Sequence, residues 1–150
     1  METDLNATEL RAWQALLHAH DQVTRKLDAE LRDEHGLSLV SYDVLLRLAR
    51  APGRALRMTE LAGKVLMSPS GLTRVVDRLV AAGLVQRDRF EGDARGMLAR
   101  LTEPGRQVLR RAARTHLRGI REHFTGPLSP AQLRNVASAL EIIAGPHTPH

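Results

Sequence analysis

One stretch of the chain constrains the fold more than any other. Residues 69–82 carry a complete apolar stripe at positions i, i+3, i+4, i+7 and i+8, formed by Leu72, Val75, Val76, Leu79 and Val80. Residues at these spacings line one side of a helix. Ser68 is suited to cap the start of this helix, Pro69 to occupy its first position and Gly83 to end it. The pattern predicts a short helix that packs on a core through one face.

The opposite face of this helix carries small and basic residues. They are Ser70, Gly71, Thr73, Arg74, Asp77 and Arg78. Hydroxyl groups near a helix start can approach phosphates closely, because backbone N–H groups and the helix dipole favour anions there. An arginine such as Arg74 can form two hydrogen bonds with a guanine edge or a phosphate. A preceding short helix capped by Thr59, followed by the turn Leu66-Met67-Ser68, gives the spacing of a helix-turn-helix. An ordinary surface helix with two arginines is the alternative.

Two short strands, over residues 84–90 and 96–101, are predicted directly after this helix. The strands contribute Arg87, Arg89 and Arg100, and the turn between them contributes Asp93 and Arg95. Asp93 can brace the turn while Arg95 projects into a narrow minor groove, where negative potential is concentrated. A solvated turn of mixed charge is the alternative. Together, the helices and the charged hairpin predict a mainly α fold with a small β-hairpin wing, a winged helix-turn-helix.

Long amphipathic helices are predicted on both sides of this unit. The first covers residues 8–34, with Asn6 or Thr8 as its cap. A second is capped by Ser38 and stopped by Pro52-Gly53. A later helix, 103–124, is capped by Thr102. Ser129 opens a capping box for the last helix, whose inward residues are expected to be Leu133, Val136, Ala137, Leu140 and Ile143. The small central unit cannot cover all these apolar stripes, so we expect a second chain; a monomeric bundle is the alternative.

The net charge of +5 is unevenly spread along the chain. Residues 1–50 hold nine acids and six bases, a balance of −3, whereas residues 51–102 hold five acids and nine bases, a balance of +4. A basic segment beside an acidic one indicates a module that binds a polyanion. The last third, residues 103–150, also carries +4, from three acids and seven bases. Its arginines are expected on a solvated face or opposite acids of the first helix, so only about half of the excess basic charge indicates nucleic acid.

Several classes of protein are excluded or disfavoured by what the sequence lacks. The chain has no cysteine, which excludes disulfides, a thiol nucleophile and a thiol redox sensor. No apolar run reaches the roughly 18 residues of a membrane span, and no signal pattern opens the chain, so we expect a cytoplasmic protein without a membrane partner. No phosphate loop or catalytic motif is present, which predicts no enzyme activity and no cofactor. The seven histidines show no convergent spacing, so no metal site is expected.

The motifs between about Ser38 and Gly105 carry a family resemblance. They are Tyr42-Asp43-Val44-Leu45-Leu46-Arg47-Leu48, Thr59-Glu60-Leu61-Ala62, Ser68 to Arg78, Leu72-Thr73-Arg74-Val75-Val76-Asp77-Arg78-Leu79, Gly83-Leu84-Val85, Asp93-Ala94-Arg95 and Leu101-Thr102-Glu103-Pro104-Gly105-Arg106. This combination, with the order of the helices, resembles the MarR family of bacterial transcriptional regulators. The most specific part is the Asp-x-Arg wing followed by Leu-Thr-x-x-Gly-Arg. Ala94 departs from the pattern, because the family often has a second arginine there.

The resemblance implies a homodimer that binds a roughly palindromic operator in double-stranded DNA. Residues 1–37 and 103–150 would form the helical dimerisation region, and residues 38–102 the DNA-binding lobe. Residues 69–82 would enter the major groove, while Arg95, oriented by Asp93, would reach the minor groove. The expected DNA contacts are Ser68, Ser70, Gly71, Thr73, Arg74, Asp77, Arg78, Arg87, Arg89, Asp93 and Arg95. A winged-helix module for protein interaction or RNA binding is the alternative.

The resemblance also implies a repressor that releases DNA when a small aromatic or phenolic acid binds between the dimerisation region and the lobe. The candidate pocket residues are Trp13, Leu17, His20, Tyr42 and His116. An aromatic wall beside a cationic group suits an aromatic carboxylate. Packing is the alternative role for Trp13 and Tyr42, the only tryptophan and the only tyrosine of the chain.

Overall fold

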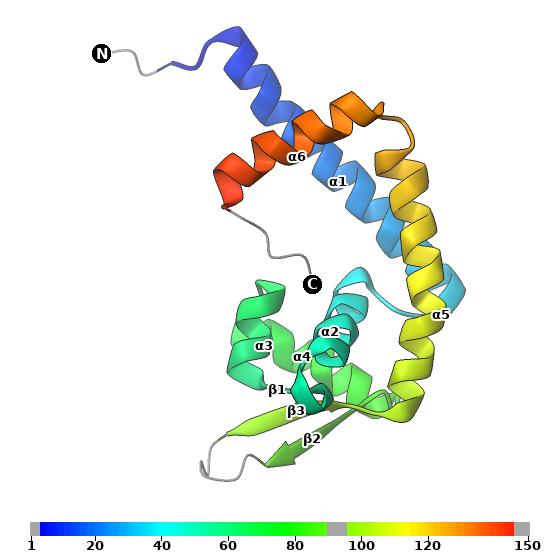
Figure 1. The fold of residues 1–150 in the computed structure, drawn as a ribbon. Helices are drawn as coiled ribbons and strands as arrows, with labels where there is room; N and C mark the ends of the chain where they lie inside the picture. The colour runs from blue at the N-terminus through cyan, green and yellow to red at the C-terminus, as the bar shows by residue number, and fades with distance from the viewer. Residues whose placement is uncertain (1–3, 90–95, 146–150) are drawn as a thin grey trace.

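The computed structural model describes residues 4–89 and 96–145, which form a mainly helical winged helix-turn-helix (Figure 1). In chain order its elements are α1 (Ala7–His35), α2 (Leu39–Arg50), the 3-10 turn η1 (Pro52–Arg54), β1 (Ala55–Arg57), α3 (Met58–Val65), α4 (Pro69–Ala81), β2 (Val85–Arg89), β3 (Met97–Leu101), α5 (Glu103–Ile120), the π-helical segment η2 (Arg121–Thr125) and α6 (Pro130–Ala144). The predicted fold class is therefore confirmed.

The chain has an open, arched shape with a lobe at one end and an arm at the other (Figure 1). The lobe contains α2, α3, α4 and the sheet, and the arm contains α1, the far end of α5 and α6. α5 connects them, because it starts beside the sheet and packs along the second half of α1. Leu27 and Leu31 of α1 and Ala112 of α5 are buried in this contact region. No helix in the described parts of the chain has the length and apolarity needed to cross a membrane.

The lobe is built on one continuous apolar core. Its fully buried side chains include Leu45 and Leu48 of α2, Leu61 of α3 and Val76 of α4. The apolar stripe predicted for residues 69–82 faces this core, with Val80 at its half-buried edge. Each such side chain contributes roughly 1.5–3 kcal/mol through removal from water. The polar face of α4 is thereby held outward.

The wing is a three-stranded antiparallel sheet in the order β1-β3-β2. The predicted strands correspond to β2 and β3, but β1 was missed. Three residues are too few to show an alternating pattern, and Leu56 pairs with Ala99, far along the chain. Leu56 and Ala99 are buried, so the third strand ties the wing to the core of the lobe.

Side-chain caps fix most helix starts. Asn6, not Thr8, caps α1 and forms a reciprocal capping box with Glu9. The predicted capping residues Ser38, Ser68, Thr102 and Ser129 each accept a hydrogen bond from the backbone N–H three residues later. The prediction for Thr59 is wrong, because α3 already starts at Met58 and Arg57, at the end of β1, occupies the cap position.

Two expectations for the arm need correction. The helix predicted over 103–124 ends as an α-helix at Ile120 and continues as the π-helical η2. In α6, the residues expected to face inward are not buried: Leu133 and Val136 are half-buried, and Ala137, Leu140 and Ile143 are exposed. The reason is that α6 does not pack extensively on any described element of its own chain.

Candidate nucleic-acid interface

The start of α4 presents a cluster of small polar groups. The Oγ of Ser68 accepts a hydrogen bond from the backbone N–H of Gly71 at 3.2 Å and lies 3.4 Å from the Oγ of Ser70. Gly71 has a local reason to lack a side chain, because a Cβ there would lie 3.1 Å from the Oγ of Ser68. Thr73 donates from its hydroxyl group to the carbonyl of Pro69 at 2.9 Å. This helix end can therefore meet a phosphate with backbone N–H and hydroxyl groups together.

The exposed face of α4 matches the sequence prediction closely. Ser68, at its cap, and five helical residues predicted to contact DNA are exposed, and Gly71 is half-buried; the five are Ser70, Thr73, Arg74, Asp77 and Arg78. Arg74 and Arg78 form no ion pair or hydrogen bond with another residue in the described part of the chain. Two guanidinium groups are thus presented to solvent, one turn apart, with all their donors available to a ligand.

Arg87 and Asp77, both predicted to contact DNA, contact each other. The Nη2 of Arg87 lies 2.5 Å from the Oδ1 of Asp77 and 3.4 Å from the carbonyl oxygen of Thr73. The Arg87 side chain is only 28% exposed, whereas that of Asp77 is 55% exposed. The pair joins β2 of the wing to the exposed face of α4. It fixes the orientation of two surfaces that a duplex would meet together.

A groove of about 530 Å³ lies where α3, α4 and the wing meet. It is lined by Arg57, Met58, Thr59, Thr73, Asp77, Arg87, Gly96 and Met97. The Arg87–Asp77 pair is therefore part of its wall, and the N-terminal turn of α3 forms the other side.

Unlike Arg87, Arg89 of the wing is not engaged by any carboxylate of the described residues. Arg89, at the end of β2, is exposed and has no ion pair within the described residues. Asp93 and Arg95, which the sequence places at the tip of the wing, lie outside the described residues.

Sequence reasoning missed the structural role of Arg100. The Nε of Arg100 donates to the Oδ2 of Asp88 at 2.7 Å, and its Nη1 donates to the carbonyl of Gly53 at 2.9 Å. The hydrogen bond from Arg100 lowers the pKa of the Asp88 carboxyl. Arg100 therefore ties β3 to β2 and to η1 (Pro52–Arg54), instead of serving as a further basic group of the wing. Gly53 is 47 residues away, so no local pattern signals this contact.

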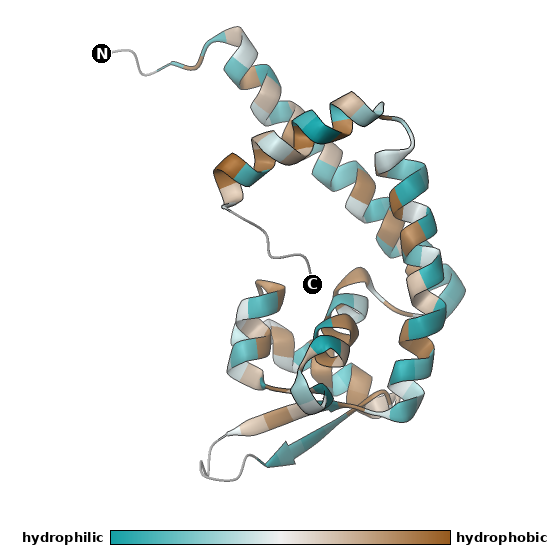
Figure 2. Cartoon of the chain, in the orientation of Figure 1, coloured by the Kyte–Doolittle hydropathy of each residue, from teal (hydrophilic) through white to brown (hydrophobic). Residues whose placement is uncertain are grey.

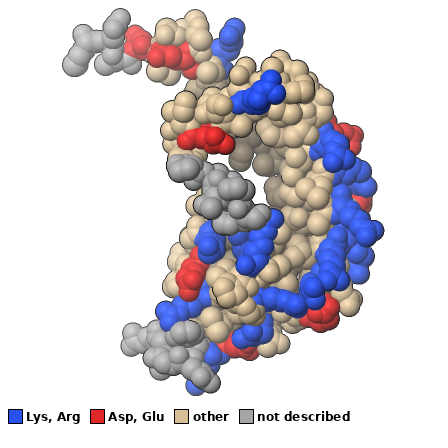
Figure 3. Space-filling model, in the orientation of Figure 1, with Lys and Arg blue, Asp and Glu red and all other residues tan. Residues whose placement is uncertain are grey.

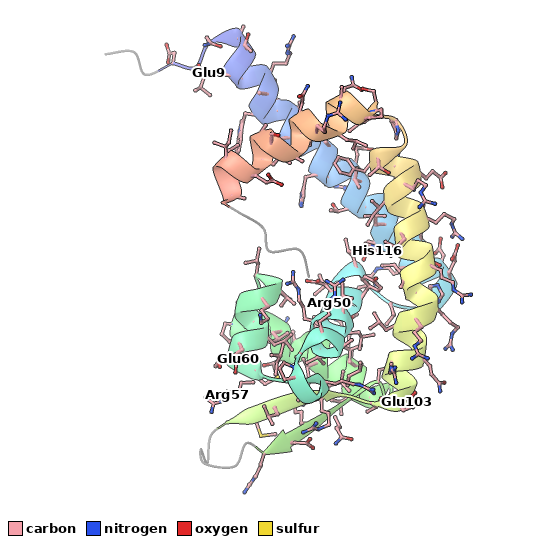
Figure 4. All side chains as sticks on the ribbon, in the orientation of Figure 1. Glu9, Arg50, Arg57, Glu60, Glu103 and His116 are labelled. Carbon is pink, nitrogen blue, oxygen red and sulfur yellow. The ribbon has the colours of Figure 1, made fainter. Side chains whose placement is uncertain are left out.

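The candidate effector residues fall into two separate groups. The rings of Tyr42 and His116 are in contact, with centroids 4.5 Å apart, and Figure 4 shows His116 on the part of α5 beside α2. Burial lowers the pKa of His116 and raises that of Tyr42, so both rings are neutral at pH 7. The Nδ1 of His116 is buried and has no hydrogen-bond partner in the described structure.

The other three candidates do not reach this pair within one chain. Trp13, Leu17 and His20 are exposed on the first half of α1. His35, at the end of α1, bonds Thr115 beside His116. At about 1.5 Å of rise per residue, Trp13 lies about 33 Å and His20 about 22 Å from His35 along the axis of α1. The predicted five-residue pocket is therefore not assembled by a single chain.

One group of side chains in the described residues has the composition of a metal site. Ligand atoms of Glu30, Glu122 and His123 lie within 4.8 Å of one another. The cluster joins α1 to η2, remote from α4 and the wing (Figure 1).

Comparisons with known proteins agree with this geometry. A model of the MarR family matches residues 35–96. The chain is 30% identical, over 120 residues, to the HTH-type transcriptional regulator PecS of Dickeya dadantii, covering 79% of this chain and 70% of the relative. It resembles the crystal structure of Sco3205, a MarR family transcriptional regulator from Streptomyces coelicolor in complex with DNA. The TM-score is 0.90 at 35% identity, over 96% of this chain and 90% of that one. AbsC, from the same organism, gives a TM-score of 0.86 at 35% identity, over 94% and 95%. These relatives are transcriptional regulators, not enzymes.

Proposed function

This chain belongs to the MarR family of DNA-binding transcriptional regulators, and from that premise we propose that it is a homodimeric repressor of a palindromic operator, released by a small aromatic acid. The observation that carries the proposal is the exposed face of α4, where Arg74 and Arg78 have no partner among the described residues. Such a face, beside a wing that is held to it by the Arg87–Asp77 pair, suits a duplex.

In the proposed complex α4 lies in the major groove. Arg74 reads a base edge or holds a phosphate, and the Ser68–Ser70 cluster at the helix start meets the backbone. Arg89 and the tip of the wing, with Arg95 oriented by Asp93, follow the phosphates into the minor groove. Asp77 and Arg87 act mainly by positioning, because each is engaged by the other. Sco3205, at 35% identity, has been crystallised with DNA, which supports this part of the proposal.

Apolar side chains in the arm support the proposed homodimer. Those exposed on α1, before it and on α6 include Leu5, Leu10, Trp13, Leu16, Leu17, Leu140, Ile142 and Ile143. Figure 2 shows apolar residues along the visible side of α6, up to its end. Monomeric soluble proteins rarely expose large contiguous apolar patches. A second copy that covers both helices accounts for it and sets two lobes side by side on a two-fold axis.

For the effector, we place the aromatic acid at the Tyr42–His116 pair. The unpartnered Nδ1 of the neutral His116 offers a polar contact beside an aromatic ring. Trp13, Leu17 and His20 can join this pocket only from the first helix of the second chain, because their own α1 carries them too far away. The pocket therefore depends on the proposed dimer.

The decisive experiment measures binding of the Arg74→Ala variant to DNA from the upstream region of the protein's own gene. Loss of a base-edge contact should cost on the order of 1–3 kcal/mol, which is roughly a ten- to hundredfold weaker affinity. Arg110→Ala, an exposed arginine on α5, is the matched control and should bind like the wild type. Circular dichroism checks that both variants are folded. Benzoates added to the wild-type complex test release.

Two outcomes would overturn the proposal. If Arg74→Ala binds the operator as tightly as the wild type, α4 is not the reading surface. If binding of the wild type is equal for unrelated duplexes, or stronger for RNA, the chain is a winged-helix module of another kind, which is the alternative left by the sequence.

A further inference from the structure

A histidine and two glutamates meet where α1 passes η2, in a place that the proposed DNA and effector sites do not use. We call Glu30, Glu122 and His123 the arm cluster; their ligand atoms all lie within 4.8 Å of one another. The His123 side chain is 14% exposed and that of Glu30 is 28% exposed, whereas Glu122 is exposed. The cluster is thus half enclosed, with one carboxylate at its solvent side.

The π-helical turn makes this arrangement possible. The backbone N–H of Gly126 donates to the carbonyl of Arg121 at 2.7 Å, a hydrogen bond that spans five residues instead of four. In an α-helix successive side chains point about 100° apart, and the wider π turn reduces that angle. The neighbours Glu122 and His123 can therefore both bring a ligand atom toward Glu30. Single π turns of this kind occur often at functional sites.

Only one of the two carboxylate oxygens of Glu30 has a hydrogen-bond partner among the described residues. Its Oε1 is hydrogen-bonded to the Nε2 of His123. Its Oε2 is buried and has no hydrogen-bond partner in the described structure. Gly119 makes room for this oxygen, because a Cβ at that position would lie 2.5 Å from it. A buried carboxylate oxygen without a partner is costly, and buried carboxylates in proteins are paired with cationic groups or coordinate metals.

We propose that the arm cluster binds one Zn²⁺ ion. An imidazole nitrogen and carboxylate oxygens are both zinc ligands, and three protein ligands leave a fourth position open to water. Magnesium and calcium prefer oxygen ligands alone, so the histidine disfavours them. Ligands of a tetrahedral zinc ion lie about 3.4 Å apart. The exposed Glu122 side chain can rotate to close the remaining distance. The ion would join α1 to η2 within the arm.

No pattern in the sequence points to this site. Among the histidines, only His116 and His123 are spaced to lie on one helix face. In the structure His116 contacts Tyr42, whereas His123 contacts Glu30. Two of the three ligands are adjacent in sequence, which an ordinary helix would spread apart. The third is 92 residues before Glu122 on another helix.

Calorimetric titration of Zn²⁺ into the full chain tests the proposal without DNA, so its result is independent of the proposed regulator function. The tail histidines His147 and His150 are replaced by Ala in all samples to remove background binding. We expect one zinc ion per chain and no binding of Mg²⁺. Glu122→Gln and His123→Ala should each weaken zinc binding at least tenfold. The variant His18→Ala keeps the site and should bind like the reference.

Glu122→Gln separates a metal site from a structural contact. His123→Ala also removes the hydrogen bond with Glu30, and this loss alone can lower stability. Glu122 is exposed and takes no part in that bond, so Glu122→Gln should fold normally. Zinc should raise the thermal midpoint of the reference protein but not that of Glu122→Gln, since a ligand stabilises only the state it binds. Absence of zinc binding, or binding that neither variant weakens, would show the arm cluster to be a hydrogen-bonded contact only.

Discussion

Leu66 is one of two non-glycine residues in the described chain that have a positive φ; the other is Arg54. Leu66 ends α3 in the turn of the helix-turn-helix with φ 56° and ψ 43°, the left-handed region, and its side chain is 91% exposed. A residue with a Cβ loses roughly 1–2 kcal/mol in this region, whereas glycine does not. The turn needs this conformation, because Leu66 and Met67 both donate to the carbonyl of Ala62. Leucine is therefore tolerated here without a packing reason.

We expect Leu66→Gly to raise the free energy of unfolding by about 0.5–1 kcal/mol, after the greater freedom of glycine in the unfolded chain is subtracted. Urea unfolding measures the change. Ala29→Gly, at an exposed position inside α1, is the control and should lower stability by about 1 kcal/mol. A loss of stability in Leu66→Gly comparable to that in the control would mean that the left-handed residue is not strained.

At the residue scale, the sequence predicts which side chains are exposed better than it predicts which residues they contact. The 3.6-residue period shows that Arg74 and Arg78 point away from the core, since it depends only on neighbours along one helix. It cannot show that Arg87 contacts Asp77, because that depends on how β2 lies against α4. The same holds for Arg100, whose two partners come from β2 and η1. Arginines that look alike in sequence therefore divide into available and engaged groups only in three dimensions.

At the scale of the elements, the junction between α5 and the wing leaves no room for a side chain at Gly105. Thr102 donates from its hydroxyl to the carbonyl of Gly83 and from its N–H to that of Leu84, and it accepts a bond from the N–H of Gly105. A Cβ on Gly105 would lie 2.1 Å from the carbonyl oxygen of Leu84 and 2.8 Å from a methyl carbon of Leu101. The first distance involves backbone, which cannot move without disturbing the start of β2.

We therefore expect Gly105→Ala to lower the free energy of unfolding by about 2–3 kcal/mol, a value typical of overpacking. Thermal or urea unfolding gives the size of the effect. Gly63→Ala is the matched control, because Gly63 is also helical but nothing lies within 4 Å of a Cβ there. Replacing a helical glycine in open space should stabilise the protein by roughly 0.5–1 kcal/mol. Equal effects of both changes would show that the predicted clash is relieved by movement of α5.

Elements with strong local signals were predictable, and those that depend on distant partners were not. α1, α4 and α6 follow from their caps and apolar periods. β1 has three residues and exists because β3 pairs with it. The π turn of η2 has no distinct composition, so an unbroken helix was the natural expectation for residues 103–124.

Seen as a whole, the molecule distributes charge and apolar surface unequally. Lys and Arg gather in a band over α5, along one edge of the view in Figure 3. Arg110, Arg111, Arg114 and Arg118 are exposed on this helix, and Arg121 is exposed at the start of η2. Arg118 pairs with Glu34 of α1 at 2.6 Å. These arginines belong to the arm and its connection to the lobe, not to α4, so the basic charge of residues 103–150 is separate from the proposed DNA surface.

α6 leaves its apolar side chains largely exposed in the described chain. Its residues Ile142 and Ile143 are 85% and 78% exposed although isoleucine is among the residues most often buried. No described residue of α6 is buried. Its amphipathic pattern correctly indicated an apolar surface, but the sequence does not say which chain covers it.

We expect the double variant Ile142→Glu/Ile143→Glu to convert the proposed dimer into monomers. Burial of an isoleucine contributes roughly 1.5–3 kcal/mol. A two-fold dimer contains each change twice, so the dissociation constant should rise at least a hundredfold. Analytical ultracentrifugation across a concentration series measures it. Operator affinity should fall with it, because two linked lobes bind far more tightly than one.

Ser138→Glu is the control, because it adds a charge at another exposed position of α6 without removing an isoleucine. It should remain dimeric if the isoleucine variant dissociates through loss of apolar contact and not through added charge. The lobe should remain folded in the isoleucine variant, since α2, α3 and α4 have their own core and α6 takes no part in it. Circular dichroism and thermal unfolding of the monomer test that independence. A wild-type chain that is monomeric at all concentrations, or a double variant that stays dimeric, would rule out α6 as the surface that joins two copies.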